Sequence, residues 1–209
     1  GNIWYFGQNA GIDFNSGSAI AISNSGMDAS EGCASISDDN GSLLFYTDGS
    51  LVYNQQHAVM PNGDSLNGDA TSTQSAIIVK EPASSSRYYI FTVDDNGGLN
   101  GLSYSIVDMS LNAGFGDVIN KNTPLDAPTP EKVLAIKHQN CSDFWIVTQN
   151  LTSDYHTYIL TSSGITNSTS PIISTGTGVA TIAGYLKANT DGSRIANALY
   201  NGDFSGDFC

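Results

Sequence analysis

The sequence predicts an all-β protein made of four-stranded antiparallel sheets arranged as a β-propeller. Short apolar and aromatic runs alternate with polar turns along the whole chain, as in a succession of short strands. The turns open near residues 38, 82, 138 and 189, in steps of 44, 56 and 51 residues. A period of about 50 residues built from short strands is typical of propeller blades. A β-sandwich with evenly spaced hairpins gives similar spacing, and it is the alternative fold.

Residues 31–54 form the reference unit of this pattern. Residues 33–37 alternate small or apolar with polar side chains, which predicts a half-buried strand. The turn at 38–41 reads Asp-Asp-Asn-Gly, and Asn and Gly tolerate the positive φ of a tight hairpin. Two further strands are predicted at 43–47 and 51–53, on either side of an Asp-Gly turn. Such a unit cannot bury both of its faces alone, so it predicts further units that pack against it.

The same scheme of strand, polar turn and aromatic strand recurs three times along the chain. The 209 residues are therefore interpreted as one propeller-like domain, 1–209, with an N-terminal strand at Ile3–Phe6 that closes the ring. Its four blade-like units lie near residues 31–75, 76–130, 131–180 and 181–209. A complete seven-bladed propeller needs roughly 300 residues, so the chain is expected to be an incomplete part of a larger one.

Composition excludes several classes of partner. The formal net charge is −13, which argues against nucleic acid and against anionic lipid headgroups, because both are bound through basic side chains. Charged residues make up only 13% of a chain rich in Ser, Thr, Asn and Gly, and this composition is typical of secreted β-proteins. The sequence contains no apolar run of about 20 residues, so no membrane-spanning helix is expected. The strand-like beginning is that expected of a mature chain after removal of a signal peptide.

Eight motifs recur in the order found in one group of exported proteins. They are WYFGxNAGxDF at 4–14, EGCASISDxNGxLLFYTDG at 31–49, VMPNG at 59–63, STQSAIIV at 72–79, YYIFTVD at 88–94, GLxYSxVDMSLNxGxGDV at 101–118, EKxxAxKH at 131–138 and GYLKxxxDGxxxA at 184–196. Together they resemble the N-terminal propeller-like region of large secreted proteins of the Bacteroidota. Those proteins often carry a gliding-motility-associated or type IX secretion sorting domain at the far C-terminus. The present sequence contains no sorting domain.

The resemblance implies a non-enzymatic module for adhesion, display or extracellular assembly. It implies an extracellular or cell-surface location, with the type IX secretion machinery or outer-membrane surface proteins as partners. Two other functions remain open. One is a carbohydrate-binding or carbohydrate-active propeller, which requires acids and exposed aromatic residues gathered at the channel mouth. The other is a structural subunit of a surface filament, which requires free strand edges that pair with the next copy.

Two acidic turns are candidate calcium sites. Asp38 and Asp39, and again Asp94 and Asp95, precede an Asn-Gly pair and offer carboxylate oxygens. Neither stretch continues with the alternating acids and the twelfth-position Glu of an EF-type loop, so hairpin turns are the preferred interpretation. No other metal or cofactor is expected.

Ser65 is a candidate for glycosylation. It lies in Gly-Asp-Ser-Leu, the nucleophile motif of some serine esterases, but the sequence lacks the Asp-x-x-His that those enzymes need. The same Asp-Ser-Leu also matches the acceptor of O-linked glycans in Bacteroidota. An unmodified loop serine is the simplest alternative.

The cysteines and carboxylates leave further alternatives open. Cys33 and Cys141 are a candidate disulfide, with Cys209 as an odd third thiol, although three free thiols fit the sequence as well.

Four carboxylates are able to approach one another in a propeller channel, as the acid pair of a glycosidase must: Glu31, Asp94, Asp108 and Glu131. The three histidines show no metal-binding spacing and are interpreted as structural.

Overall fold

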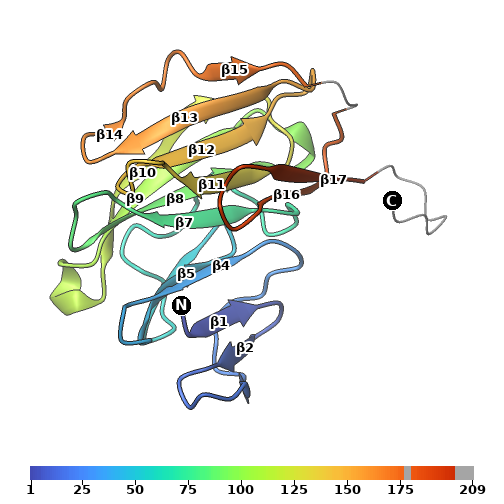
Figure 1. Ribbon diagram of the computed structural model, residues 1–209. Helices are drawn as coiled ribbons and strands as arrows, with labels where there is room; N and C mark the ends of the chain where they lie inside the picture. The colour runs from blue at the N-terminus through green and yellow to red at the C-terminus, as the bar shows by residue number, and fades with distance from the viewer. Residues whose placement is uncertain (177–179, 201–209) are drawn as a thin grey trace.

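The computed structural model describes residues 1–176 and 180–200, and it confirms the all-β prediction (Figure 1). Five antiparallel sheets follow one another in chain order and are called the first to the fifth sheet. The first contains β1 (Ile3–Phe6), β2 (Ala10–Asp13) and β3 (Ile20–Ile22); the second contains β4 (Ala34–Ser37), β5 (Leu43–Thr47) and β6 (Val52–Asn54). The third contains β7 (Ala76–Lys80), β8 (Arg87–Val93), β9 (Leu102–Asp108) and β10 (Asp117–Asp126).

The last two sheets complete the described part of the chain. The fourth contains β11 (Val133–Lys137), β12 (Phe144–Gln149), β13 (Tyr155–Thr161), β14 (Gly164–Ile165) and β15 (Ile172–Ser174); the fifth contains β16 (Gly184–Ala188) and β17 (Ile195–Leu199). Two short 3-10 turns, η1 (Asp95–Gly97) and η2 (Asn112–Gly114), lie in the third sheet's loops. The described residues form no helix long and apolar enough to cross a membrane.

The first strand of each sheet lies against the first strand of the next. The neighbouring pairs are β1 and β4, β4 and β7, β7 and β11, and β11 and β16. The five sheets are therefore arranged in series, with their first strands gathered together (Figure 1). Within the described residues, none of the five sheets closes on itself.

The regularly spaced turns occupy equivalent places in their sheets. The turns near 38, 82, 138 and 189 each join the first strand of a sheet to its second strand. The repeated Asp-Asp-Asn-Gly does not mark equivalent places. Its first copy joins β4 to β5, whereas its second copy lies between β8 and β9 and forms η1. The same four-residue turn sequence therefore does not indicate which two strands of a sheet the turn connects.

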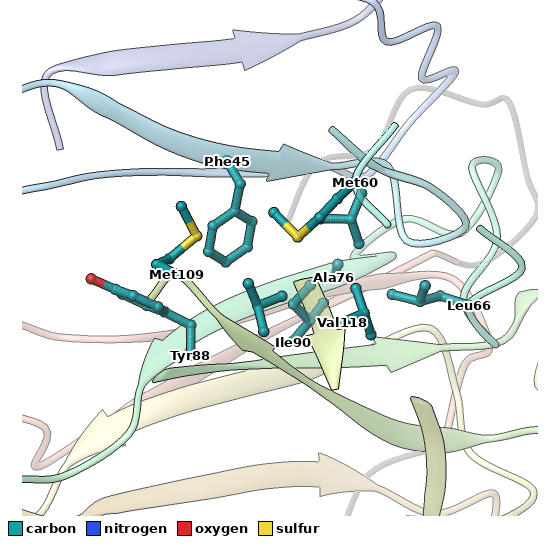
Figure 2. Close-up of a cluster of buried hydrophobic side chains, with 10 residues drawn as sticks. Phe45, Met60, Leu66, Ala76, Tyr88, Ile90, Met109 and Val118 are labelled. Atoms are coloured by element: carbon teal, nitrogen blue, oxygen red, sulfur yellow. The ribbon is translucent and has the colours of Figure 1, made fainter. Parts of the chain in front are cut away.

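The number of strands per sheet differs from the expected four. Among the described residues, only the third sheet consists of four strands in simple order. The second sheet stops at three because the segment after β6 folds as successive turns, with positive φ at His57, Asn62 and Ser65. Met60 and Leu66 of this segment point into the core and fill space beside the sheet (Figure 2).

The N-terminal strand belongs to a sheet of its own. β1 pairs with β2 along its whole length, and its other edge meets β4 through the Ser35 hydroxyl, which donates to the carbonyl of Ile3 (3.1 Å). The closing role predicted for Ile3–Phe6 is not formed among the described residues. Instead, the strand fixes the first sheet to the second.

An apolar cluster lies between each sheet and the next. In the third sheet, neighbouring residues of β8 face opposite ways, as strand geometry requires. Tyr88 and Ile90 pack towards the second sheet, and Tyr89 and Phe91 pack towards the fourth. Figure 2 shows the cluster between the second and third sheets, where the buried ring of Phe45 lies edge-on to Tyr88 with centroids 5.6 Å apart. Each middle strand thus stabilises two interfaces at once.

A hydrogen-bonded aromatic group joins the first and second sheets. Nδ1 of His57 lies 3.2 Å from the Tyr46 hydroxyl, and Nε2 lies 2.9 Å from Nδ2 of Asn24. Oδ1 of Asn24 accepts from the Tyr5 hydroxyl (2.9 Å), so its NH₂ group faces the histidine. Nε2 must then act as an acceptor, which requires neutral imidazole. Burial lowers the pKa of His57 below its usual value, in agreement with this geometry.

This histidine predicts a loss of stability in mild acid. Because the pKa of His57 is lower in the folded than in the unfolded chain, the unfolded chain takes up its proton first as the pH falls. The contribution is fully present above about pH 6.5, the unfolded value, and is lost as the pH falls towards the lower folded value. Urea unfolding between pH 7.5 and 5 should show a steeper decline for the wild type than for His57→Asn. Equal slopes would contradict this assignment.

Candidate functional site

An open pocket of about 900 Å³ lies where the chain enters the first strands of four sheets. We call it the mouth pocket. Glu31 precedes β4, Thr73 precedes β7, Glu131 precedes β11, and Gly184 begins β16. The remaining lining comes from Asn96 in η1, from Thr71, Ala183 and Tyr185, and from the end of β17 with Tyr200 after it. Because the first strands of the sheets are neighbours, residues more than 150 positions apart in the sequence line one cavity.

Glu131 ties three of these segments together. Its Oε2 accepts from the backbone N–H of Thr73 (2.8 Å) and from the Thr73 hydroxyl (3.1 Å). Its Oε1 accepts from the backbone N–H of Asn96 (2.9 Å). The residue is only 4% exposed, so the protein itself supplies the hydrogen bonds of this carboxylate. Glu131 therefore acts as a structural acid at the back of the mouth pocket.

The fifth sheet is held to the mouth pocket by polar contacts. The backbone N–H of Gly184 donates to the Thr73 hydroxyl (3.1 Å). The side chain of Gln74 pairs with the backbone of Leu186, accepting from its N–H (2.7 Å) and donating to its carbonyl (3.3 Å). Leu186 is also fully buried against the fourth sheet. These contacts fix the start of β16, and with it the position of Tyr185.

A buried lysine supports the same segment from below. Lys132 is fully buried, and its Nζ donates to the Thr181 hydroxyl (3.0 Å), which in turn donates to the carbonyl of Ala183 (3.0 Å). Burial lowers the pKa of Lys132 to about 8, and the adjacent Glu131 carboxylate partly opposes this shift. The Lys132 side chain lies directly beneath Gly184, where an added Cβ would come within 2.7 Å of Cε. Glycine at this position lets the lysine reach Thr181.

The accessible chemistry of the mouth pocket is aromatic, hydroxylic and acidic. Tyr185 and Tyr200 are 50% and 51% exposed, and Glu31 is exposed beside them. Thr71 and Thr73 add hydroxyl groups to the lining. An aromatic face, several hydrogen-bonding groups and one free carboxylate suit a ligand that has both an apolar face and polar edges.

The predicted calcium residues use their oxygens within their own turns. Oδ1 of Asp38 accepts from the N–H groups of Asn40 (2.9 Å) and Ser42 (2.8 Å). The Asp94 carboxylate accepts from the N–H groups of Asp95 and Asn100 (both 3.0 Å). Asp39 is exposed at the first turn, and Asp95 accepts from the Asn96 side chain. In the described part of the chain, no three His, Cys, Asp or Glu side chains are grouped to hold an ion.

Ser65 lies exposed on a surface turn. It has a positive φ of 53°, and its carbonyl accepts from the Asn122 side chain (2.8 Å). The neighbouring Asp64 carboxylate lies 3.3 Å from Nζ of Lys121, which lowers the pKa of this exposed acid. Leu66, the next residue, is buried in the core. The serine hydroxyl is thus presented to solvent, and its glycosylation stays a prediction.

The cysteines are not paired in the described residues. Cys33 and Cys141 are both free thiols, so the candidate disulfide between them is not formed. Cys33 is half-buried beside β1, where its Sγ donates to the carbonyl of Tyr5 (3.5 Å), and Cys141 is exposed in the turn between β11 and β12. Cys33 directly precedes β4 of the second sheet, whereas Cys141 lies in a turn of the fourth sheet. Cys209 lies outside the described residues.

The four candidate channel acids separate into two groups. Glu31 and Glu131 both line the mouth pocket, and Asp94 lies in the loop that carries the lining residue Asn96. Asp108 lies elsewhere, at the end of β9, where Ser110 donates to it and Arg87 approaches within 3.4 Å. These hydrogen bonds, led by the Ser110 hydroxyl, lower the pKa of Asp108 to about 2.

Another acid lies beside a histidine, away from the mouth pocket. Asp126 at the end of β10 lies 2.5 Å from Nδ1 of His156 and accepts from the Tyr158 hydroxyl (3.1 Å). Burial together with this carboxylate raises the pKa of Tyr158. The group links β10 to β13 and agrees with the structural role expected for His156.

Sequence reasoning missed most of the mouth pocket. Thr73, Lys132 and Tyr185 lie within the resemblance motifs at 72–79, 131–138 and 184–196, but those motifs assign them no role. A usable signal existed in the places they occupy, because each lies just before, or at the start of, the first strand of its sheet. Aligning the four units on their first strands would have brought these positions together.

Comparison with known proteins identifies no relative of this chain. No protein-family model, no curated protein and no solved structure matches it.

Proposed function

We propose that this protein is a non-enzymatic, exported surface module that binds a glycan in the mouth pocket. The observation that carries the proposal is the grouping of the half-exposed Tyr185 and Tyr200 with the free carboxylate of Glu31. A tyrosine ring offers a flat apolar face and a polar edge, which suits the apolar face and hydroxyl rim of a sugar. The notable excess of acidic residues disfavours acidic sugars and favours neutral ones.

The carboxylates support binding rather than hydrolysis. Glycosidases need two carboxyl groups free to act on one bond, one as an acid and the other as a base or nucleophile. In the mouth pocket, Glu31 is exposed, but both oxygens of Glu131 accept hydrogen bonds from the protein. One free acid serves to hold a sugar hydroxyl and is insufficient for this reaction.

The arrangement of the sheets supports a propeller as the underlying fold. In a propeller, the first strands of successive blades surround a channel, and ligands bind at its mouth. The five sheets in series, with neighbouring first strands, are the arrangement expected of several adjacent blades. Export by a type IX system and a role in adhesion follow from the sequence resemblance and form part of the same proposal.

Calorimetric titration with a panel of neutral, amino and acidic oligosaccharides tests this function. We expect a neutral oligosaccharide to bind, and Tyr185→Ala to weaken that binding at least about tenfold, equivalent to about 1.4 kcal/mol. Trp4→Ala is the matched control, because Trp4 is equally exposed but lies on the first sheet, away from the mouth pocket. Binding that survives Tyr185→Ala would place the ligand elsewhere, and no binding to any member of the panel would refute the glycan proposal.

A further inference from the structure

A second pocket, of about 500 Å³, lies between the second and third sheets. We call it the intersheet pocket. Its lining comes from the ends of β4 and β7, from the turns that follow these strands, and from neighbouring parts of β5, β8 and the segment after β9. The mouth pocket lies at the other ends of β4 and β7, where the chain enters them. Both sheets have a further sheet on their other side, so the intersheet pocket belongs to the interior of the series.

The floor of the intersheet pocket is apolar. Ile36 and Leu44 contribute from the second sheet, and Tyr88 of β8 and Met109 just after β9 contribute from the third. All four belong to the apolar cluster between these sheets, and Figure 2 shows Met109 and the Tyr88 hydroxyl at the same end of it. A cavity of roughly 300–1,000 Å³ with an apolar lining and a few polar groups is typical of small-molecule sites.

A buried tyrosine hydroxyl has no protein partner in this pocket. Tyr88 is only 6% exposed, and no described residue forms a hydrogen bond with its hydroxyl. Burial raises the pKa of Tyr88, and the carboxylates of Asp39 and Asp38 raise it further, so the hydroxyl stays protonated at neutral pH. Tyrosine hydroxyls usually have a partner when they are buried. The unpaired hydroxyl therefore marks a place where a ligand can supply one.

Opposite charges enter the intersheet pocket from its two walls. On the third sheet, Lys80 pairs directly with Tyr88 across β7 and β8, and its Nζ lies 6.0 Å from the centre of the tyrosine ring. On the second sheet, Asp39 lies in the turn between β4 and β5, near enough to Tyr88 to raise the pKa of its hydroxyl. In the part of the chain that the structure describes, neither Lys80 nor Asp39 forms an ion pair within the protein. Both charges are therefore available to a ligand.

The two charges select the class of ligand. A simple cation would meet Lys80, and a simple anion would meet Asp39 and the adjacent Asp38. A zwitterion that carries an ammonium and a carboxylate on one small framework satisfies both walls. The Tyr88 hydroxyl lies beside the acids, where its oxygen can accept from the ammonium. The apolar floor adds a preference for a ligand with an apolar side chain.

We propose that the intersheet pocket binds an α-amino acid or a dipeptide that carries an apolar side chain. The ligand's ammonium pairs with Asp39 and donates to the Tyr88 oxygen, and its carboxylate pairs with Lys80. The apolar side chain covers the floor of the pocket beside Leu44. This site is separate from the mouth pocket and does not depend on the glycan proposed there.

Calorimetric titration with leucine, leucyl-leucine and three analogues tests the site. N-acetylleucine lacks the ammonium, leucinamide lacks the carboxylate, and glycine lacks the apolar side chain. We expect leucine or leucyl-leucine to bind, and each analogue to bind at least about tenfold more weakly than the better of the two. The stronger of the two shows whether a free amino acid or a dipeptide has the fitting length. Absence of binding by both, or analogues that bind as tightly, would overturn the proposal.

Single substitutions assign each charge to its part of the ligand. Asp39→Asn should shrink the difference in affinity between leucine and N-acetylleucine at least about threefold, and Lys80→Gln should do the same for leucine and leucinamide. Tyr88→Phe keeps the buried ring and removes the hydroxyl, so it should weaken leucine binding about threefold. Lys137→Gln is the control, because it removes an exposed basic charge on β11, outside the intersheet pocket, and should leave binding unchanged.

Near-ultraviolet circular dichroism checks that each variant remains folded. Leucine affinities that Asp39→Asn and Lys80→Gln both leave unchanged would overturn the proposal, because the ligand would then lie elsewhere. Leucine binding that Lys137→Gln weakens equally would overturn it as well, because a general effect of charge would then explain the result.

Discussion

Replacing Glu131 with alanine is expected to lower the free energy of unfolding by about 3 kcal/mol, because hydrogen bonds to a charged group each contribute about 1.5–3 kcal/mol. The change leaves the backbone N–H groups of Thr73 and Asn96 without the carboxylate that now accepts from them. It also removes the link between the segments that precede β7 and β11, so ligand binding at the mouth pocket should be lost together with stability. Urea unfolding followed by tryptophan fluorescence measures the first effect, and calorimetric titration measures the second.

Glu31→Ala is the matched control for this experiment. Glu31 lines the same pocket, but its side chain is exposed and makes no hydrogen bond within the described residues. Its loss should change stability by no more than about 0.5 kcal/mol, the usual range for surface substitutions. Ligand affinity should nevertheless fall. Equal stability losses for the two variants would contradict the structural role assigned to Glu131.

Phe45→Ala is expected to lower the free energy of unfolding by about 4 kcal/mol, within the range for deleting a buried aromatic ring. The ring is fully buried between the second and third sheets, beside Met60 and Tyr88 (Figure 2). Its removal leaves a cavity at the interface that joins the N-terminal sheets to the rest of the chain. Thermal or urea unfolding measures the loss directly.

The control for Phe45 is an apolar side chain outside any interface. Leu99 is 92% exposed in the loop after η1, so Leu99→Ala should change stability by less than about 0.5 kcal/mol. A local effect of Phe45→Ala, with unfolding of only the first two sheets, would appear as a second transition. A loss below about 1 kcal/mol would contradict the packing described for this interface.

Local patterns predicted the strands well, because they depend on neighbours in the sequence. The aromatic run at Tyr88 to Phe91 and the turn at Asp38 define their strands without long-range information. The number of strands per sheet was harder to predict. The segment with Met60 and Leu66 has apolar residues like a strand, but the conformations of His57, Asn62 and Ser65 turn it into a loop.

The mouth pocket was predicted only in part, because its residues come together through contacts between sheets. Glu31 and Glu131 are two of the four acids that the sequence allows to approach one another in a channel, and both line the pocket. The hydrogen bonds that occupy Glu131 depend on Thr73 and Asn96, 58 and 35 residues away in the chain. Composition and spacing carry no information about such partners. The burial of Lys132 could not be predicted from the sequence for the same reason.

The uneven distribution of basic residues has a consequence for digestion by proteases. Proteases of the trypsin type cut after Lys or Arg, and the first such residue is Lys80, at the end of β7. The first two sheets and the loop that follows them therefore contain no peptide bond that these enzymes recognise. That part of the protein should survive trypsin even when it is transiently unfolded, and tryptic mapping should recover it only as one very long peptide.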